Sequence, residues 1–141
     1  MGYEALDFYD VDSLLTDEER MIRDAVRDWV DESVIPKIEN ACRDGVFLDE
    51  WRQEIGSMGI LGAPLKGYGC PGLSYTAYGV ICRELERGDS GIRSFASVQG
   101  SLAMYPIWDF GSEDQKEKYL PRMATGAVSY THLTLPTRFS V

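Results

Sequence analysis

The sequence predicts an all-α fold, and three observations carry that prediction. Apolar residues recur at helical spacing in several segments, whereas no strong alternation of apolar and polar residues occurs before residue 126. Residues that cap helices stand directly before these segments. The chain has 141 residues, 44% hydrophobic and 26% charged, which suits one domain with its own core. There is no internal repeat and no linker, so we expect a single helical unit.

The first helix begins after Thr16, which forms a T-x-x-E capping box with Glu19. Apolar residues then recur on one helical face: Ile22, Val26, Trp29 and Val30. Pro36 should kink or end this helix, because proline lacks the backbone N–H that the helix needs. Gly45 should end the segment after Pro36.

The middle of the chain is predicted to hold a short helix and a long irregular connection. The helix runs from about Asp49 to Met58 and is stopped by Gly59. Residues 60–65 are expected to form a short extended link. Residues 66–72 (KGYGCPG) contain four helix- and strand-breaking residues, so the sequence predicts a loop there.

Three further helices are predicted after this loop. Ser74 can cap a helix from about Tyr75 to Arg87. Its expected inner face holds Tyr78, Ile81, Cys82 and Leu85. Residues 88–91 (GDSG) are a tight break, and residues 92–110 form a helix rich in Ser, Ala and Gly. A last helix, capped by a Ser112–Gln115 box, ends near Gly126.

The charge of the chain excludes some classes of partner. There are 14 basic and 23 acidic residues, for a net charge of −9, and the first 50 residues alone hold 15 acids against 5 bases. An acidic chain without a basic patch is not expected to bind nucleic acid or an anionic membrane. The start of the sequence lacks the basic and apolar regions typical of a signal peptide, and no apolar run reaches spanning length, so we expect neither a signal peptide nor a membrane span. Cys42, Cys70 and Cys82 form no CxxC pair, so we expect reduced thiols, no metal site and a cytoplasmic protein.

Two motifs resemble active-site signatures but lack the required context. Gly67, Gly69 and Gly72 fit the G-x-G-x-x-G nucleotide-binding pattern, yet the loop is neither preceded by a firm strand nor followed by a helix and a second strand. A shaped structural turn is favoured instead. Ser90 in GDSG resembles a protease nucleophile, but the single histidine, His132, lies far away in the C-terminal tail. Ser90 is therefore interpreted as a helix N-cap.

Glu86, Arg93 and Ser94 straddle the turn between two predicted helices. A guanidinium fork, a hydroxyl and free N–H groups at a helix start would suit a ligand carboxylate. Glu86 could hold Arg93 in position, or accept a hydrogen bond from a protonated ligand acid. A plain Arg93–Glu86 ion pair that ties the two helices together accounts for the spacing equally simply and is favoured from spacing alone.

Three segments carry a resemblance to a known family: residues 61–72 (LGAPLKGYGCPG), 83–94 (RELERGDSGIRS) and 110–116 (FGSEDQK). From about Leu14 to Gly126 the chain resembles the N-terminal helical domain of acyl-CoA dehydrogenases. The third segment is general to that family, whereas the first two look like its glutaryl-CoA dehydrogenase branch. The expected organisation is an N-terminal extension (1–13), this helical domain (14–126) and a tail (127–141).

The resemblance implies the N-terminal third of a flavoenzyme that also has a β-domain and a C-terminal helical bundle. Such an enzyme would oxidise glutaryl-CoA with FAD, release CO₂ to give crotonyl-CoA, pass electrons to electron-transfer flavoprotein and assemble as a homotetramer. Positions matching Arg93 and Ser94 bind the far carboxylate in that branch, with Glu86 beside them. The catalytic base and most FAD contacts belong to the other domains, so we expect no catalytic, cofactor-binding or metal residue here and no activity from this chain alone.

The tail departs from the family. The segment 128–137 (VSYTHLTLPT) stands where a flavin-contacting Leu-Thr-Glu-Pro motif would be expected, and it resembles a translated sequencing adapter. We expect residues 127–141 to be non-native, in which case His132 has no function. The alternative is a genuine β-rich lead into the next domain.

Two other functions remain open from sequence. Another acyl-CoA dehydrogenase with a different acyl specificity would share most of these motifs. A stand-alone helical module that binds a partner without redox chemistry would differ by binding no flavin.

Overall fold

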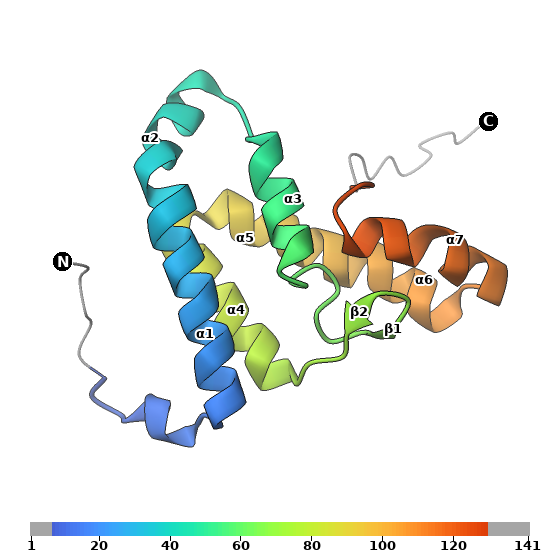
Figure 1. Ribbon diagram of the computed structural model, residues 1–141, viewed down its shortest axis with the longest axis horizontal. Helices are drawn as coiled ribbons and strands as arrows, with labels where there is room; N and C mark the ends of the chain where they lie inside the picture. The colour runs from blue at the N-terminus through green and yellow to red at the C-terminus, as the bar shows by residue number, and fades with distance from the viewer. Residues whose placement is uncertain (1–6, 130–141) are drawn as a thin grey trace, which may run out of the picture.

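The computed structural model describes residues 7–129, and within them the regular elements are helices apart from one small hairpin (Figure 1). The all-α prediction is confirmed. The elements in chain order are the 3-10 helix η1 (Val11–Leu14), α1 (Asp17–Trp29), the π-helical segment η2 (Val30–Val34), α2 (Ile35–Asp44), α3 (Asp49–Ser57), β1 (Lys66–Gly67), β2 (Cys70–Pro71), α4 (Tyr75–Gly88), α5 (Ser90–Ser97), the π-helical segment η3 (Val98–Met104), α6 (Tyr105–Phe110) and α7 (Glu113–Ala124).

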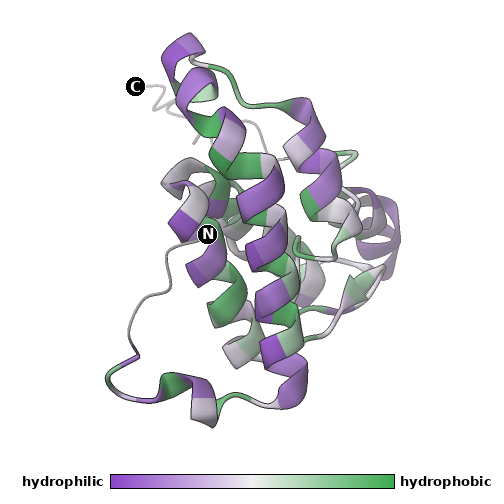
Figure 2. Cartoon of the chain, turned by 60° about the vertical axis from the view of Figure 1, so that its left-hand side comes forward, coloured by the Kyte–Doolittle hydropathy of each residue, from purple (hydrophilic) through white to green (hydrophobic). Residues whose placement is uncertain are grey.

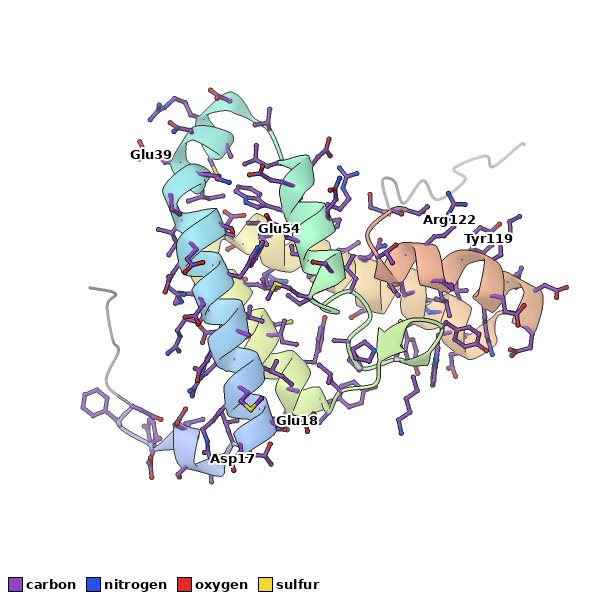
Figure 3. The ribbon with its side chains drawn as sticks, in the orientation of Figure 1. Asp17, Glu18, Glu39, Glu54, Tyr119 and Arg122 are labelled. Carbon is purple, nitrogen blue, oxygen red and sulfur yellow. The ribbon has the colours of Figure 1, made fainter. Side chains whose placement is uncertain are left out.

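The first helix starts as the capping box predicts. Thr16 Oγ1 accepts from the Glu19 N–H, while the Glu19 carboxylate accepts from the Thr16 N–H. Asp17 and Glu18 lie at this end of α1 (Figure 3), where negative charge is favoured by the helix dipole. The chain after α1 continues as helix through η2 and α2, and Gly45, at φ +65°, ends it as predicted.

Neither Pro36 nor Pro106 ends the helical stretch in which it stands. In each case a π-helical segment directly before the proline keeps the helix continuous. Pro36 stands at the second residue of α2, directly after η2, and Pro106 stands at the second residue of α6, directly after η3. At the end of η2 the Ile35 N–H donates to the Val30 carbonyl, and the Tyr105 N–H does the same to Gly100, five residues back. This wider spacing lets the helix run on past a residue that has no N–H to donate.

Two predictions for residues 60–72 are wrong. Residues 60–65 are not extended: Gly62 adopts φ +69°, and the Leu65 N–H donates to its carbonyl at 2.8 Å, which closes a turn. Residues 66–72 are not a plain loop, because β1 pairs with β2 in antiparallel register. Tyr68 and Gly69 connect the strands at φ +54° and +84°, the two positive values of a type I′ hairpin turn.

A single residue, Asp89, separates α4 from α5. The Ser74 cap of α4 is confirmed, with its hydroxyl accepting from the Ala77 N–H. The N-cap of α5, however, is Asp89, whose carboxylate accepts from the Ile92 N–H at 3.0 Å, and not Ser90 as predicted. The next helix therefore starts at Ser90, two residues before the predicted start, and runs through η3 and α6 to Phe110.

The core joins all the long helices. In Figure 1, α1 and α4 lie side by side, and the hairpin lies beside α6 and α7, to which Lys66 and Tyr68 are hydrogen-bonded. Figure 2 shows hydrophilic and hydrophobic bands alternating along the helices, as expected when each has one face in the core. Fully buried residues include Val30, Ile55, Leu61, Ile81, Leu85 and Leu120. A polar contact also joins α1 to α3: Trp29 Nε1 donates to the Glu54 carboxylate at 2.7 Å (Figure 3).

The carboxylate of Glu84 is buried between α1 and α4. Glu84 is 1% exposed and accepts hydrogen bonds from Arg27 of α1 and from its own neighbours Arg83 and Arg87, at 3.0–3.3 Å. Arg87 also reaches Asp31 at 2.7 Å. Because the carboxylate is surrounded by guanidinium groups, it ties the two helices without leaving an unpaired charge in the core.

Within residues 7–129, no helix has both the length and the apolar character needed to cross a membrane.

Candidate functional site

The helices α4 and α5 form a hairpin whose facing surfaces carry polar side chains at regular spacing. Tyr78, Cys82 and Glu86 are four residues apart on α4, and Arg93, Ser97 and Ser101 are four residues apart on α5 and η3. Residues four apart share one helix face. We call these six residues the α4–α5 seam.

Glu86 and Arg93 meet at one end of the seam. Arg93 Nε donates to Glu86 Oε2 at 2.6 Å, and Arg93 Nη1 lies 3.5 Å from Ser97 Oγ. The Arg93 and Glu86 side chains are 37% and 45% exposed. The ion pair between neighbouring helices is therefore present. It uses Nε and leaves the two terminal nitrogens with only the long Ser97 contact among the described residues, so it is compatible with a ligand carboxylate at that end.

The electrostatics of this pair keep both groups charged. The Arg93 hydrogen bond lowers the pKa of Glu86, and a second hydrogen bond from Ser90 lowers it further. Glu86 in turn raises the pKa of Arg93. A carboxylate held in this state suits the role of orienting Arg93 better than that of sharing a proton with a ligand.

Among the described residues, Ser94 does not take part in the hydrogen bonds of the Glu86–Arg93 pair. It lines a hollow of about 230 Å³ together with Gly91, Phe95 and Gln99. The hydroxyl that Arg93 contacts belongs to Ser97, which the sequence reasoning did not single out. The available signal was its spacing of four residues from Arg93, which places both on one helix face.

The other end of the seam opens into a second hollow, of about 140 Å³. Tyr75, Tyr78, Ser101 and Tyr105 contribute to its wall, with Leu65 from the turn before the hairpin. Burial raises the pKa of Tyr78, although a hydrogen bond with Ser101 partly offsets this. The hollow is therefore apolar with neutral hydroxyl groups, while the opposite end of the seam is charged.

Cys82 lies between the two ends of the seam. Burial raises the pKa of its thiol, a hydrogen bond with Tyr78 opposes that shift, and the thiol also senses the charges of Arg93 and Glu86. A thiol that stays protonated is a poor nucleophile. Cys82 therefore serves as a small side chain between the charged end of the seam, at Glu86 and Arg93, and the apolar end, at Tyr78.

The remaining motif residues show no second site. The Gly67-Gly69-Gly72 segment forms the hairpin and leads into α4 and then α5, without the second strand that a dinucleotide fold requires. No group of three His, Cys, Asp or Glu side chains suited to a metal ion occurs in residues 7–129. His132 and residues 130–141 of the tail lie outside the described residues. At the tail's start, Gln99 Nε2 donates to the Val128 carbonyl at 2.8 Å.

Comparisons with known proteins agree on one family. A family model described as acyl-CoA dehydrogenase, N-terminal domain, matches residues 16–127. A solved glutaryl-CoA dehydrogenase from Mycobacterium smegmatis, in complex with FADH2, is 46% identical with a TM-score of 0.85, over 88% of this chain and 32% of that chain. A second structure of glutaryl-CoA dehydrogenase from the same organism is 52% identical with a TM-score of 0.81, over 84% of this chain and 31% of that chain.

A curated relative outside that branch is less similar. Mitochondrial isovaleryl-CoA dehydrogenase from Pongo abelii is 31% identical over 116 residues, which are 79% of this chain and 27% of that protein. The chain thus spans about a third of the length of these relatives or less.

Proposed function

Because this chain belongs to the acyl-CoA dehydrogenase family, we propose that residues 14–126 are the N-terminal helical domain of a longer flavoenzyme that oxidises glutaryl-CoA. The observation that carries the choice of substrate is the Glu86–Arg93 pair with Ser97 beside it. Sequence identity also supports this choice of substrate. The chain is 46% and 52% identical to the two glutaryl-CoA dehydrogenases but 31% identical to the isovaleryl-CoA enzyme.

The proposed mode of binding is built on the seam. The far carboxylate of the glutaryl group binds the terminal nitrogens of Arg93, and Ser97 donates from one turn along the helix. Ser94 is retained as a candidate that contributes from the neighbouring face. The methylene groups pass Cys82 toward the apolar hollow at Tyr78. A straight fatty acyl chain would leave the arginine without a ligand partner, and placing apolar groups against a charge is unfavourable.

FAD is proposed as the cofactor of the complete enzyme. In this proposal most contacts to FAD come from the other domains of the longer enzyme. When bound elsewhere in the enzyme, FAD supplies the two-electron oxidation. The residues of this chain bind and orient the substrate. Loss of CO₂ to give crotonyl-CoA, electron transfer to electron-transfer flavoprotein, a homotetrameric assembly and a place in lysine and tryptophan degradation belong to the same proposal.

The test of the substrate is Arg93→Ala in the full-length enzyme, assayed with glutaryl-CoA and with butyryl-CoA. Removing a hydrogen-bonded charge should raise KM for glutaryl-CoA about ten- to hundredfold and leave KM for butyryl-CoA unchanged. Arg122→Ala is the matched control, since Arg122 is on α7 (Figure 3) and its side chain has no ion pair among the described residues. An unchanged KM for glutaryl-CoA returns Arg93 to a purely structural ion pair.

The domain assignment is tested by resequencing the source DNA. Resequencing the source across codon 126, from a primer outside the present read, should show the frame continuing into a β-domain, with residues 127–141 replaced. A frame that ends after Val141, together with a purified protein that is colourless, would favour a stand-alone helical module instead.

A further inference from the structure

The hydroxyl of Ser90 is free of the capping role that its position suggests. Asp89 caps α5, with its carboxylate accepting from the Ile92 N–H at 3.0 Å. Ser90 is the first residue of the helix, and its Oγ points back across the turn. It donates to Glu86 Oε1 at 2.6 Å. The side chain is therefore used between the helices and not at the helix end.

Glu86 is consequently held from two sides. Its Oε1 accepts from Ser90 and its Oε2 accepts from Arg93 Nε, each at 2.6 Å. With one oxygen engaged by Ser90, the carboxylate meets the guanidinium through a single oxygen and at Nε. The end of the guanidinium that carries Nη1 and Nη2 is left to the long contact with Ser97.

This arrangement determines which edge of Arg93 a ligand can use. A guanidinium binds a carboxylate most strongly through two parallel N–H donors. If Glu86 were free to rotate, it could take two donors of Arg93 itself and compete with the ligand. The Glu86 side chain is 45% exposed, so packing alone does not prevent this rotation. The hydrogen bond from Ser90 to Glu86 Oε1 prevents this rotation.

We propose that Ser90 is a positioning residue for the carboxylate end of the acyl substrate: through Glu86 it orients Arg93 so that the terminal nitrogens remain available to the ligand. This inference rests on the proposed function, because it assigns a role within the same carboxylate site. Ser90 does not touch the substrate.

The experiment measures kcat and KM of the full-length enzyme with glutaryl-CoA and butyryl-CoA for Ser90→Ala and Ser90→Thr. Losing one hydrogen bond to a charged, part-exposed group should raise KM for glutaryl-CoA about fivefold with kcat unchanged. KM for butyryl-CoA should not move. Ser90→Thr keeps the hydroxyl and should restore the wild-type KM for glutaryl-CoA.

Ser57→Ala is the matched control, since it also removes an exposed hydroxyl hydrogen bond, to the Glu54 carbonyl at 2.7 Å, on a different helix. The inference is overturned if Ser90→Ala raises KM for both thioesters alike or leaves both unchanged while Arg93→Ala still raises KM for glutaryl-CoA. If Arg93→Ala has no effect either, the proposed carboxylate site itself fails, so the two failures are distinguishable.

Discussion

Replacing Glu84 by Gln tests whether the buried carboxylate between α1 and α4 holds the two helices together. The Glu84 side chain is 2% exposed and accepts from Arg27, Arg83 and Arg87. Glutamine has nearly the same shape, but it replaces one acceptor oxygen with an NH₂ group. That donor would then face guanidinium donors, so the variant removes charge and creates a mismatch without creating a cavity.

The magnitude depends on the burial of each partner. Removing one member of a fully buried ion pair costs about 3–5 kcal/mol. Here Arg27, Arg83 and Arg87 are 42%, 51% and 37% exposed, so water can replace part of what they lose. We therefore expect a loss of about 2 kcal/mol in the free energy of unfolding, below the fully buried range.

The assay is urea unfolding of the 141-residue chain at neutral pH, followed by tryptophan fluorescence. The midpoint should fall while the slope stays unchanged, because the surface exposed on unfolding is the same. Glu39→Gln is the matched control: its i,i+4 pair with Arg43 is 85% and 64% exposed and should contribute under about 0.5 kcal/mol. If Glu84→Gln costs no more than Glu39→Gln, the arginine cluster does not stabilise the helix pair.

Three further outcomes are expected from the same structure. Burial alone would raise the pKa of Glu84, but the three arginines hold this pKa below its ordinary 4.5. The unfolded chain therefore binds a proton at Glu84 more readily than the folded chain does, so the stability that Glu84 contributes is present above about pH 4.5 and is lost as pH falls through the lower folded pKa. Between about pH 5 and 3, the urea midpoint of Glu84→Gln should therefore fall less steeply than that of the wild-type chain. Gly56→Ala should lower the unfolding free energy by about 2 kcal/mol, because the added methyl group collides with the Thr125 carbonyl. Gly79→Ala, with open space around it in mid-helix, should raise it by about 0.5–1 kcal/mol; equal midpoints for the two glycine variants would contradict the packing described.

Local chemistry explains which elements could be predicted from sequence. The boxes at Thr16–Glu19 and Ser112–Gln115 form because both partners lie within one turn of the helix they start. The ends at Gly45 and Gly126 likewise depend on a single residue with positive φ.

The errors fall where contacts outside a single helix decide between local options. Residues 66–72 could form a loop or a hairpin, and contacts with α6 and α7 accompany the hairpin: Trp108 Nε1 donates to the Lys66 carbonyl at 2.9 Å, and Tyr68 donates to Glu113 at 2.6 Å. Asp89 and Ser90 could each cap α5. Ser90 was the wrong choice because its hydroxyl has a competing acceptor, Glu86, on the preceding helix.

The sequence by itself determined that this chain is helical, where most of its helices begin and end, and which family it resembles, because these depend on periodicity, capping and short motifs. It also brought Glu86 and Arg93 together, since one tight turn separates their helices. Only the tertiary structure decided that the Ser90 hydroxyl also reaches Glu86, because this depends on how α5 turns back on α4. Ser97 lies one helical turn from Arg93, whereas Ser94 is rotated about 100° from Arg93 around α5 and lines another hollow; how α5 packs against α4 decides what each of these helix faces meets.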